Sequence, residues 1–286
     1  MNDVHRPKLV TDRRQLRQEL FAARRAGKRI GLVPTMGALH EGHLSLVDAS
    51  RGECDQTWVT IFVNPAQFAP HEDLEAYPRN LERDLALVAS RGADLVFAPS
   101  PREIYPDGFD TYVEPGGVAK TLEGAIRPTH FRGVATVVLK LFNLVPADVA
   151  FFGRKDYQQT LVVKRMARDF DLPIEVRVCP IVRDWDGLAL SSRNAYLSPQ
   201  EREQARAIPA SLELARRLVS EGTRDAAALR EAMVKHLQAA GLEVQYVELV
   251  RDETLDPVAR IEGPTVVLVA ARAGATRLID NELLDV

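Results

Sequence analysis

Arg29-Ile30-Gly31-Leu32-Val33 opens the most informative part of this sequence, which continues as Pro34-Thr35-Met36-Gly37-Ala38-Leu39-His40-Glu41-Gly42-His43. A short apolar run that stops at a proline is typical of a buried strand. Apolar residues at helical spacing then predict a helix over residues 43–51. Strand, glycine-containing loop and helix together indicate one repeat of an alternating β/α chain.

The alternation continues toward residue 152. Apolar runs predict strands at Trp58–Val63, Asp94–Ala98 and Val149–Phe152, and helical spacing predicts helices over 80–91 and 134–144. Such alternation implies a parallel sheet with right-handed connections. Nearly continuous apolar strands suit a sheet covered on both faces. We therefore predict an α/β fold with a doubly wound parallel sheet.

Beyond Ile181 the pattern changes. Two amphipathic helices are predicted, followed by three strands, at Pro199–Ser220, Arg224–Ala240, Leu242–Val250, Thr265–Ala271 and Thr276–Ile279. Helices followed by a block of strands indicate an α+β unit. We therefore expect a first domain over residues 1–182 and a smaller α+β domain over residues 183–286.

Before the first strand, the sequence predicts a helix over residues 12–26. Thr11 is a suitable N-cap, and Gly27 is a suitable residue to end the helix. The apolar positions at helical spacing are Leu16, Leu20 and Phe21.

The composition narrows the class of protein. The chain has 286 residues, of which 46% are hydrophobic and 27% charged, as in an average globular protein. With 37 Lys and Arg against 40 Asp and Glu, the net charge is -3, so we expect no nucleic-acid partner. The N-terminus lacks the apolar region of a signal peptide, and no apolar stretch of membrane-spanning length follows. We therefore expect a cytoplasmic protein without a membrane partner.

Polar clusters follow the predicted strands, where an open parallel sheet binds its ligands. Asn64-Pro65-Ala66-Gln67-Phe68 follows the second strand, Gly153-Arg154-Lys155-Asp156-Tyr157-Gln158-Gln159 follows the fourth, and Ser191-Ser192-Arg193-Asn194 comes later. We expect the fold to gather these clusters with the glycine and histidine loop in one site. Neither a Walker A motif nor G-x-G-x-x-G is present in the sequence.

His40 and His43 are expected on one face of the first turn of a helix. A helix N-terminus presents unpaired N–H groups to phosphates, and imidazoles can donate to phosphoryl oxygens. Gly37 and Gly42 let the backbone approach a ligand closely. Two alternatives stay open: the histidines are capping or surface residues, or they belong to a metal site, although zinc needs more protein ligands than two.

The other clusters also allow two interpretations each. Lys155 and Asp156 suit a phosphate with a ribose hydroxyl or a cation, or else a solvated ion pair. Ser191-Ser192-Arg193 suits a polyphosphate, or else an N-cap or turn. Gln67 and Gln159 suit a carboxylate and a hydroxyl, or else the surface.

With these residues in view, the chain resembles the pantothenate synthetases, the pantoate:β-alanine ligases of coenzyme A biosynthesis. The resemblance spans nearly the whole chain. It rests on P-T-M-G-A-L-H-E-G-H at 34–43, F-V-N-P-A-Q-F at 62–68, Y-P-R at 77–79, R-P-T-H-F-R-G-V at 127–134, F-F-G-R-K-D-Y-Q-Q at 151–159, G-L-A-L-S-S-R-N at 187–194 and R-L-I-D-N at 277–281. The first motif is also similar to the H-x-G-H of the wider nucleotidylyltransferase superfamily.

The resemblance implies a Rossmann-like domain that binds ATP and pantoate, a smaller lid-like domain, Mg²⁺ and a homodimer. It implies that the catalytic residues are His43, His40, Lys155 and Arg193. The implied ATP-binding residues are Met36, Gly37, Ala38, Leu39, His40, Glu41, Gly42, His43, Gly153, Arg154, Lys155, Asp156, Val182, Leu190, Ser191, Ser192 and Arg193. The implied residues for pantoate and β-alanine are Gln67, Gln159, Asn64, Tyr77 and Glu123, and the implied metal ligand is Asp84. Arg154 is a departure, because the family often has Glu there.

The implied reaction activates the carboxylate of pantoate as an adenylate, which the amine of β-alanine then attacks. Two alternatives differ in class. A nucleotidylyltransferase uses the same first motif but keeps the nucleotide in its product, and the Gln67 and Gln159 clusters argue against it. A non-catalytic nucleotide-binding or scaffold protein does not need both Lys155 and Arg193 at the ligand.

Overall fold

The computed structural model describes residues 6–69, 74–75 and 77–284, and contacts divide the chain into two compact units. The first unit comprises Met1–Arg154 and Gln158–Pro180. The second comprises Lys155–Tyr157 and Ile181–Val286. A short segment that lies between two parts of the first unit in the sequence therefore belongs to the second unit by its contacts.

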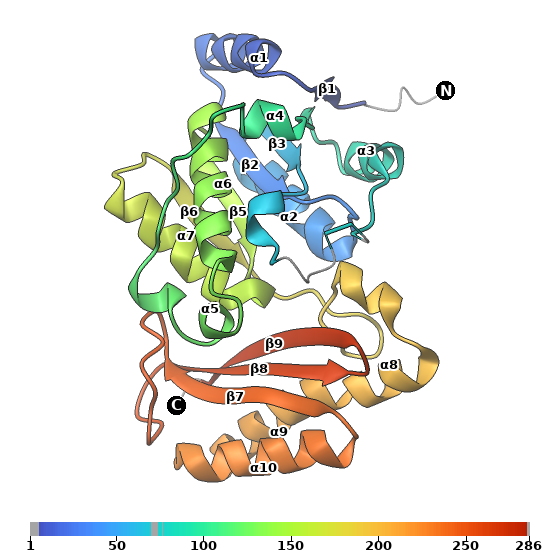
Figure 1. Cartoon of the computed structure of the whole chain (residues 1–286), viewed down its shortest axis with the longest axis vertical. Helices are drawn as coiled ribbons and strands as arrows, with labels where there is room; N and C mark the ends of the chain where they lie inside the picture. The colour runs from blue at the N-terminus through green and yellow to red at the C-terminus, as the bar shows by residue number, and fades with distance from the viewer. Residues whose placement is uncertain (1–5, 70–73, 76, 285–286) are drawn as a thin grey trace. The chain divides into compact units, whose positions relative to one another are not determined.

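The first unit is built on a six-stranded parallel sheet (Figure 1). Its spatial order is β1-β4-β3-β2-β5-β6, and each pair of neighbours is parallel. The order reverses at β2, which has β3 on one side and β5 on the other. This confirms the predicted α/β fold. The strands are β1 Lys8–Val10, β2 Ile30–Thr35, β3 Gln56–Ile61, β4 Leu95–Phe97, β5 Val149–Gly153 and β6 Glu175–Cys179.

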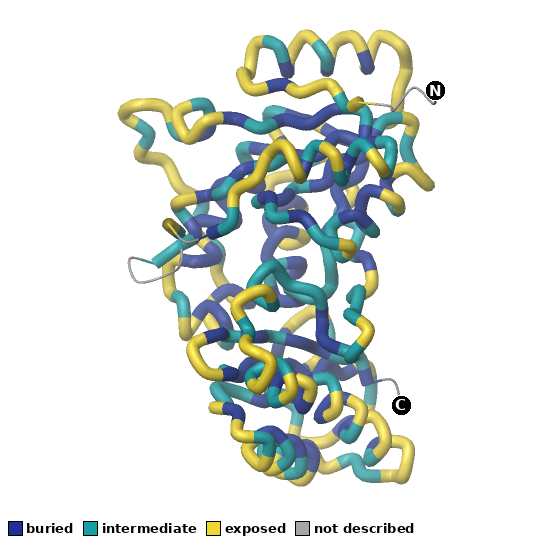
Figure 2. Tube along the Cα trace, turned by 90° about the vertical axis from the view of Figure 1, so that its right-hand side faces the viewer, coloured by how far each residue is buried: buried dark blue, intermediate teal, exposed yellow. Residues whose placement is uncertain are grey.

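Helices and a hydrophobic core accompany this sheet. Val33, Val59, Val96 and Phe151, one from each of four strands, are completely buried. Figure 2 traces such buried stretches in dark blue. The helices are α1 Arg13–Arg25, α2 Glu41–Glu53, α3 Leu81–Ser90, α4 Pro101–Ile104, α5 Glu123–Ile126, α6 His130–Leu144 and α7 Tyr157–Asp169, with 3-10 turns η1 Pro65–Gln67, η2 Gly117–Ala119 and η3 Arg154–Asp156.

The sequence pattern does not predict β1 and β6, which form the two edges of the sheet. Two of the three residues of β1 are exposed, and most of β6 is only half-buried. A strand at an edge is less enclosed than a central strand, so it lacks the continuous apolar run by which β2, β3 and β5 are recognised.

The prediction of Thr11 as the first N-cap is wrong. Asp12 caps α1, because its Oδ1 accepts the backbone N–H of Gln15 at 2.8 Å. Both residue types cap helices well, so the sequence alone does not choose between neighbours. Leu16 faces the core and is buried, whereas Phe21 is 57% exposed.

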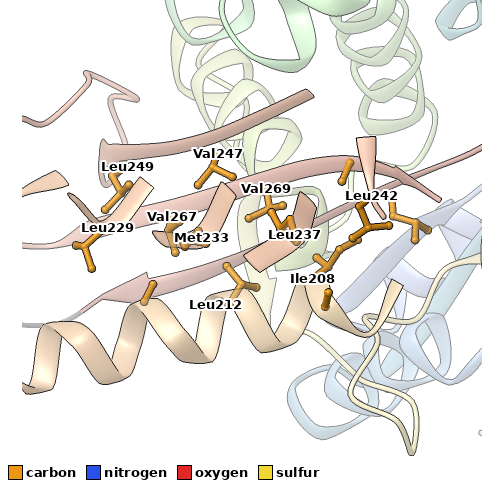
Figure 3. Close-up of a cluster of buried hydrophobic side chains, with 14 of the residues drawn as sticks. Ile208, Leu212, Leu229, Met233, Leu237, Leu242, Val247, Leu249, Val267 and Val269 are labelled. Atoms are coloured by element: carbon orange, nitrogen blue, oxygen red, sulfur yellow. The ribbon is translucent and has the colours of Figure 1, made fainter. Parts of the chain in front are cut away.

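The second unit contains a three-stranded antiparallel sheet of order β7-β8-β9. Leu212, Met233 and Val269 belong to its hydrophobic core, in which helix and sheet side chains pack together (Figure 3). The central strand β8 is buried along nearly its whole length. The elements are α8 Pro199–Ala205, α9 Ala207–Ser220, α10 Ala226–Ala239, β7 Glu243–Arg251, β8 Thr265–Ala273, β9 Thr276–Leu284 and the 3-10 turn η4 Ser192–Tyr196.

The helix predicted over Pro199–Ser220 is in fact two helices. The break lies at Arg206, between α8 and α9. Pro209 explains it, because proline has no N–H to donate to the carbonyl of Ala205, and its ring clashes with that carbonyl in a continuous helix.

Candidate active site

Two of the predicted polar loops of the first unit meet in the structure. The strands β3, β2 and β5 are consecutive in the sheet, so their carboxyl ends lie at one edge. Gln67, after β3, donates from its Nε2 to Sδ of Met36, after β2, at 2.8 Å. A thioether is a weak acceptor, so an oxygen of a ligand would be a stronger partner for this amide.

The two histidines form the start of α2. His40 is the N-cap, and its Nδ1 accepts the N–H of Gly42 at 3.2 Å. Nδ1 of His43 accepts the backbone N–H of His40 at 3.4 Å, and the ring centroids are 4.1 Å apart. Because each Nδ1 accepts, a neutral ring carries its hydrogen on Nε2. Capping and donation to a phosphate therefore use different nitrogens of the same rings.

Asp84 lies against the loop that precedes these histidines. Its Oδ2 accepts the N–H of Ala38, and its Oδ1 accepts the N–H of Leu39, each at 2.9 Å. The Asp84 side chain is 2% exposed. Glu41, by contrast, is exposed and forms an ion pair with Arg91 at 2.6 Å. The predicted metal ligand thus contacts the backbone of the predicted ATP-binding loop.

Gln67 is buried on η1 and held by residues of α6. Nδ2 of Asn64 donates to Oε1 of Gln67 and to the carbonyl of Gly133, both at 3.1 Å. Nδ1 of His130 lies 3.0 Å from the carbonyl oxygen of Gln67. A Cβ on Gly133 would clash with the carbonyl of Ala66 and lie 2.6 Å from Cα of Gln67. The motif at 127–134 therefore positions Gln67, a role that sequence reasoning missed.

Gln158 is a second residue that sequence reasoning missed. Its Oε1 accepts the N–H of Glu123 at 3.0 Å, and its Nε2 donates to the carbonyls of Val118 and Thr121, both at 2.7 Å. Gln158 therefore fixes the backbone at Glu123, a predicted pocket residue. Gln159, the predicted pantoate ligand, is half-buried on the first turn of α7. The sequence shows two adjacent glutamines, but it does not show which of the two side chains is buried.

The remaining predicted residues of the first unit have separate surroundings. Tyr77 is buried and contacts Phe68 edge to face, with ring centroids 6.0 Å apart. Gly153 ends β5, and Arg154 begins η3, both half-buried.

Lys155 is positioned by residues of the second unit. The buried Asn281, on β9, donates from Nδ2 to the carbonyl of Lys155 at 3.0 Å. The hydroxyl of Tyr157 donates to Oδ1 of Asp252 and accepts the N–H of Glu253. Nζ of Lys155 lies 3.6 Å from Oδ1 of the neighbouring Asp156, which is the ion pair that the sequence left open. The motif at 277–281 thus acquires a role in holding Lys155.

Residues 182–190 form a hairpin in the second unit. The N–H of Leu190 donates to the carbonyl of Val182 at 3.0 Å. Between them, Arg183 forms an ion pair with the buried Asp280 at 2.6 Å. Burial lowers the pKa of Arg183, but hydrogen bonding and the charge of Asp280 outweigh it and raise that pKa above its ordinary value. The hairpin is therefore fixed to β9 by a charged pair.

This hairpin leads into η4, where the other predicted cation lies. Oγ of Ser191 accepts the N–H of Arg193 at 3.3 Å, so Ser191 is an N-cap, as one alternative proposed. Asn194 donates from Nδ2 to the carbonyl of Ala189 at 3.1 Å. These bonds fix the backbone at Arg193, while the side chains of Ser192 and Arg193 are half-buried.

Comparisons with known proteins identify the family to which the chain belongs. The family model described as pantoate-beta-alanine ligase matches residues 8–283. Pantothenate synthetase 1 of Bradyrhizobium diazoefficiens is 53% identical over 278 residues, which cover 97% of this chain and 98% of that protein. The crystal structure of pantothenate synthetase from Thermus thermophilus has a TM-score of 0.92 at 45% identity, and covers 96% of this chain and 98% of its own.

A further solved structure carries ligands in its description. The pantoate-beta-alanine ligase from Francisella tularensis, complexed with beta-gamma ATP and beta-alanine, has a TM-score of 0.83 at 34% identity and covers 97% of both chains. The family model and these relatives each span nearly all of the sequence. This chain therefore belongs to the pantoate-beta-alanine ligase family.

Proposed function

We propose that this protein is an ATP-dependent ligase that condenses pantoate with β-alanine to form pantothenate. The observation that carries the proposal is the family match over residues 8–283. The paired Nδ1 caps of His40 and His43 support it, because they leave the Nε2–H tautomer that suits a phosphoryl oxygen.

The reaction has two displacement steps. A carboxylate oxygen of pantoate attacks the α-phosphorus of ATP, and pyrophosphate leaves with the electron pair of the broken P–O bond. The amine of β-alanine then attacks the acyl carbon, AMP leaves, and the amine loses a proton to form the amide. No nucleophile of the protein is needed, so the protein's work is alignment, charge stabilisation and exclusion of water.

The proposed roles follow the chemistry of each side chain. His40 and His43 donate from Nε2 to the oxygens of the phosphates, where Lys155 and Arg193 supply positive charge. The other predicted nucleotide contacts are Met36, Gly37, Ala38, Leu39, Glu41, Gly42, Gly153, Arg154, Asp156, Val182, Leu190, Ser191 and Ser192. In this proposal, the domain over residues 1–182 binds ATP and pantoate, and the domain over 183–286 supplies Arg193 to the same nucleotide as a lid-like part.

Neutral amides suit the hydroxy acid. Gln67 and Gln159 hold the carboxylate and a hydroxyl of pantoate without neutralising the attacking oxygen. Asn64, Tyr77 and Glu123 line the positions of pantoate and β-alanine. The Nε2 of Gln67 donates to the weakly accepting sulfur of Met36, which supports this assignment for Gln67.

Mg²⁺ enters in this proposal with ATP, as part of the substrate complex. The described part of the chain contains no group of three or more His, Cys, Asp or Glu that could hold a metal ion. Magnesium commonly uses one or two carboxylates together with substrate phosphates. Asp84 as one such carboxylate stays a prediction.

The homodimer and the cytoplasmic location also stay predictions. Among the described residues, neither unit contains a helix with the length and apolar character needed to cross a membrane. Sedimentation of the purified chain tests the dimer.

One assay tests the function. Incubation with ATP, Mg²⁺, pantoate and β-alanine should yield AMP and pyrophosphate, and AMP should form only when pantoate is present. A product that retains the adenine base would instead indicate a nucleotidylyltransferase. Absence of turnover would indicate a protein that only binds nucleotide.

A further inference from the structure

Asp84 is a buried charge with backbone partners. Its carboxylate, 2% exposed, accepts the N–H groups of Ala38 and Leu39 at 2.9 Å, one on each oxygen. The guanidinium of Arg83 approaches Oδ1 only to 3.8 Å. Burial of a carboxylate is costly unless hydrogen bonds replace its water. Here the replacing donors are the two backbone N–H groups.

The loop needs such a partner because of its conformation. Gly37 has φ +81°, and Ala38 has φ +51°, so two successive residues are in the left-handed region. Alanine rarely adopts that region without support from its surroundings. The successive N–H groups of Ala38 and Leu39 both donate to one carboxylate, that of Asp84 on α3. Asp84 therefore provides the support that this loop conformation needs.

The contacts of α3 with the backbone of Ala38 and Leu39, which we call the brace, include a second residue of α3, and the start of this helix is itself capped. Nη1 of Arg83 donates to the carbonyl of Leu39 at 3.2 Å, so adjacent residues of α3 bind both the N–H and the carbonyl of Leu39. Asn80 caps this helix, because its Oδ1 accepts the N–H of Arg83 at 3.0 Å. The backbone that leads directly into His40 is therefore fixed from α3.

This brace determines where the imidazoles lie. His40 follows Leu39 and is the N-cap of α2, and its N–H is the donor that holds Nδ1 of His43. A shift of the loop moves this N–H and loosens both rings. We propose that Asp84 is a positioning residue, which orients His40 and His43 by bracing the loop at Ala38 and Leu39. The proposal deepens the function proposed above, and rests on it only where turnover is measured.

The main test is Asp84→Asn, which keeps size and shape. An amide offers one oxygen, so its NH₂ group faces one of the two backbone N–H groups as donor against donor. We expect kcat for pantoate-dependent AMP formation to fall roughly tenfold to a hundredfold. The magnesium concentration at half-maximal rate should not change. The matched control is Glu82→Gln, an exposed acid on the same helix, which should leave kcat within about twofold.

A readout independent of turnover accompanies it. Long-range ¹H–¹⁵N spectra report the tautomer of each imidazole, measured at pH about 8, where an ordinary imidazole is neutral. His40 and His43 should show the hydrogen on Nε2 in the unmodified protein, and averaged signals in Asp84→Asn. This readout tests the positioning role of Asp84 separately from the proposed function. If the proposed function is wrong, the unmodified protein will form no AMP that depends on pantoate.

Gly37→Ala is a second route to the same loop, should Asp84→Asn fail to fold. Its Cβ would lie 3.0 Å from Oδ2 of Asp84, at a φ that strains alanine. It should lower kcat similarly and shift the same imidazole signals. Two results would overturn the proposal: restoration of the Asp84→Asn rate by added Mg²⁺, which identifies a metal ligand, or either variant with kcat within about threefold and unchanged tautomers.

Discussion

The histidine pair and the Lys155 segment are both predicted to bind phosphate, but they are held in opposite ways. His40 and His43 are held by bonds within the first turn of α2, and by the brace from α3 in the same unit. Lys155 lies on η3 and Tyr157 begins α7, yet their partners Asn281 and Asp252 come from much later in the chain. The histidine pair therefore depends on the first unit alone, whereas the Lys155 segment depends on β9 and on the turn that follows β7.

Among the variants that compare the histidine pair with the Lys155 segment, His43→Ala is expected to have the largest effect on kcat. Loss of one donor to a developing phosphoryl charge should lower kcat by about a hundredfold or more. Single-turnover release of pyrophosphate from ATP and pantoate measures the affected step. The imidazole of His40 also loses the ring beside it, so His43→Gln, which keeps a side-chain donor, serves as the comparison. A decrease below roughly threefold would remove His43 from catalysis.

Asn281→Ala should have the next largest effect on kcat. It should act through Lys155 and leave the histidine pair in place. Without the donor from β9, the carbonyl of Lys155 loses a buried partner, and kcat should fall roughly tenfold. In a Lys155→Ala background, the same change should have little further effect, because the two residues act together. Steady-state kinetics of the single and double variants measure this coupling.

The control is Asn143→Ala, an exposed asparagine that donates to a carbonyl within α6. It should leave kcat unchanged. Independent, multiplicative losses for Asn281 and Lys155 would contradict the positioning of Lys155 by β9.

Gly133→Ala tests the positioning of Gln67 by α6. This variant should leave the histidine pair and the Lys155 segment unchanged. The new Cβ pushes η1 away from α6, so the KM for pantoate should rise about tenfold through Gln67, with a loss of ~1–3 kcal/mol in the free energy of unfolding. Kinetics and urea denaturation measure the two effects. Gly52→Ala on α2, where a Cβ meets nothing within 4 Å, should be neutral or stabilising. An unchanged KM for pantoate in Gly133→Ala would contradict the assignment of Gln67 to pantoate binding.

The smallest effect is expected from Tyr157→Phe and depends on pH. Burial raises the pKa of Tyr157, and the hydrogen bond to Asp252 raises it further. A raised pKa means that the unfolded chain ionises first, so the stabilisation is complete below pH about 10 and is lost as pH rises further. Tyr157→Phe should reduce the free energy of unfolding by about 1 kcal/mol at pH about 8, and by less at pH about 10.5.

Urea denaturation at both pH values measures this difference. Tyr112→Phe, at an exposed tyrosine, should give the same small difference at each pH. A pH-independent effect of Tyr157→Phe would contradict the buried contact with Asp252.

Sequence patterns predict what depends on neighbours in the chain. The central strands, the start of α2 at the histidines and the cap at Ser191 all follow from local spacing and side-chain chemistry. Asp84 and Asn281 act on backbone atoms far away in the sequence, which no local pattern reveals.

The errors have equally physical reasons. Thr11 and Asp12 are both good caps, and only the geometry selects Asp12. The apolar spacing continues across the break between α8 and α9, and the prediction of one helix relied on that spacing. Pro209 nevertheless interrupts the helix. The edge strands β1 and β6 lack the apolar run on which the strand predictions depend.

The assignment of Lys155–Tyr157 to the second unit affects how this protein can be divided. A fragment cut after Pro180 would retain its histidines but lose Asn281 and Asp252, the partners of Lys155 and Tyr157 respectively. Exchange of the C-terminal part with that of a relative would therefore require compatible residues at 155–157, so the two halves are not interchangeable modules.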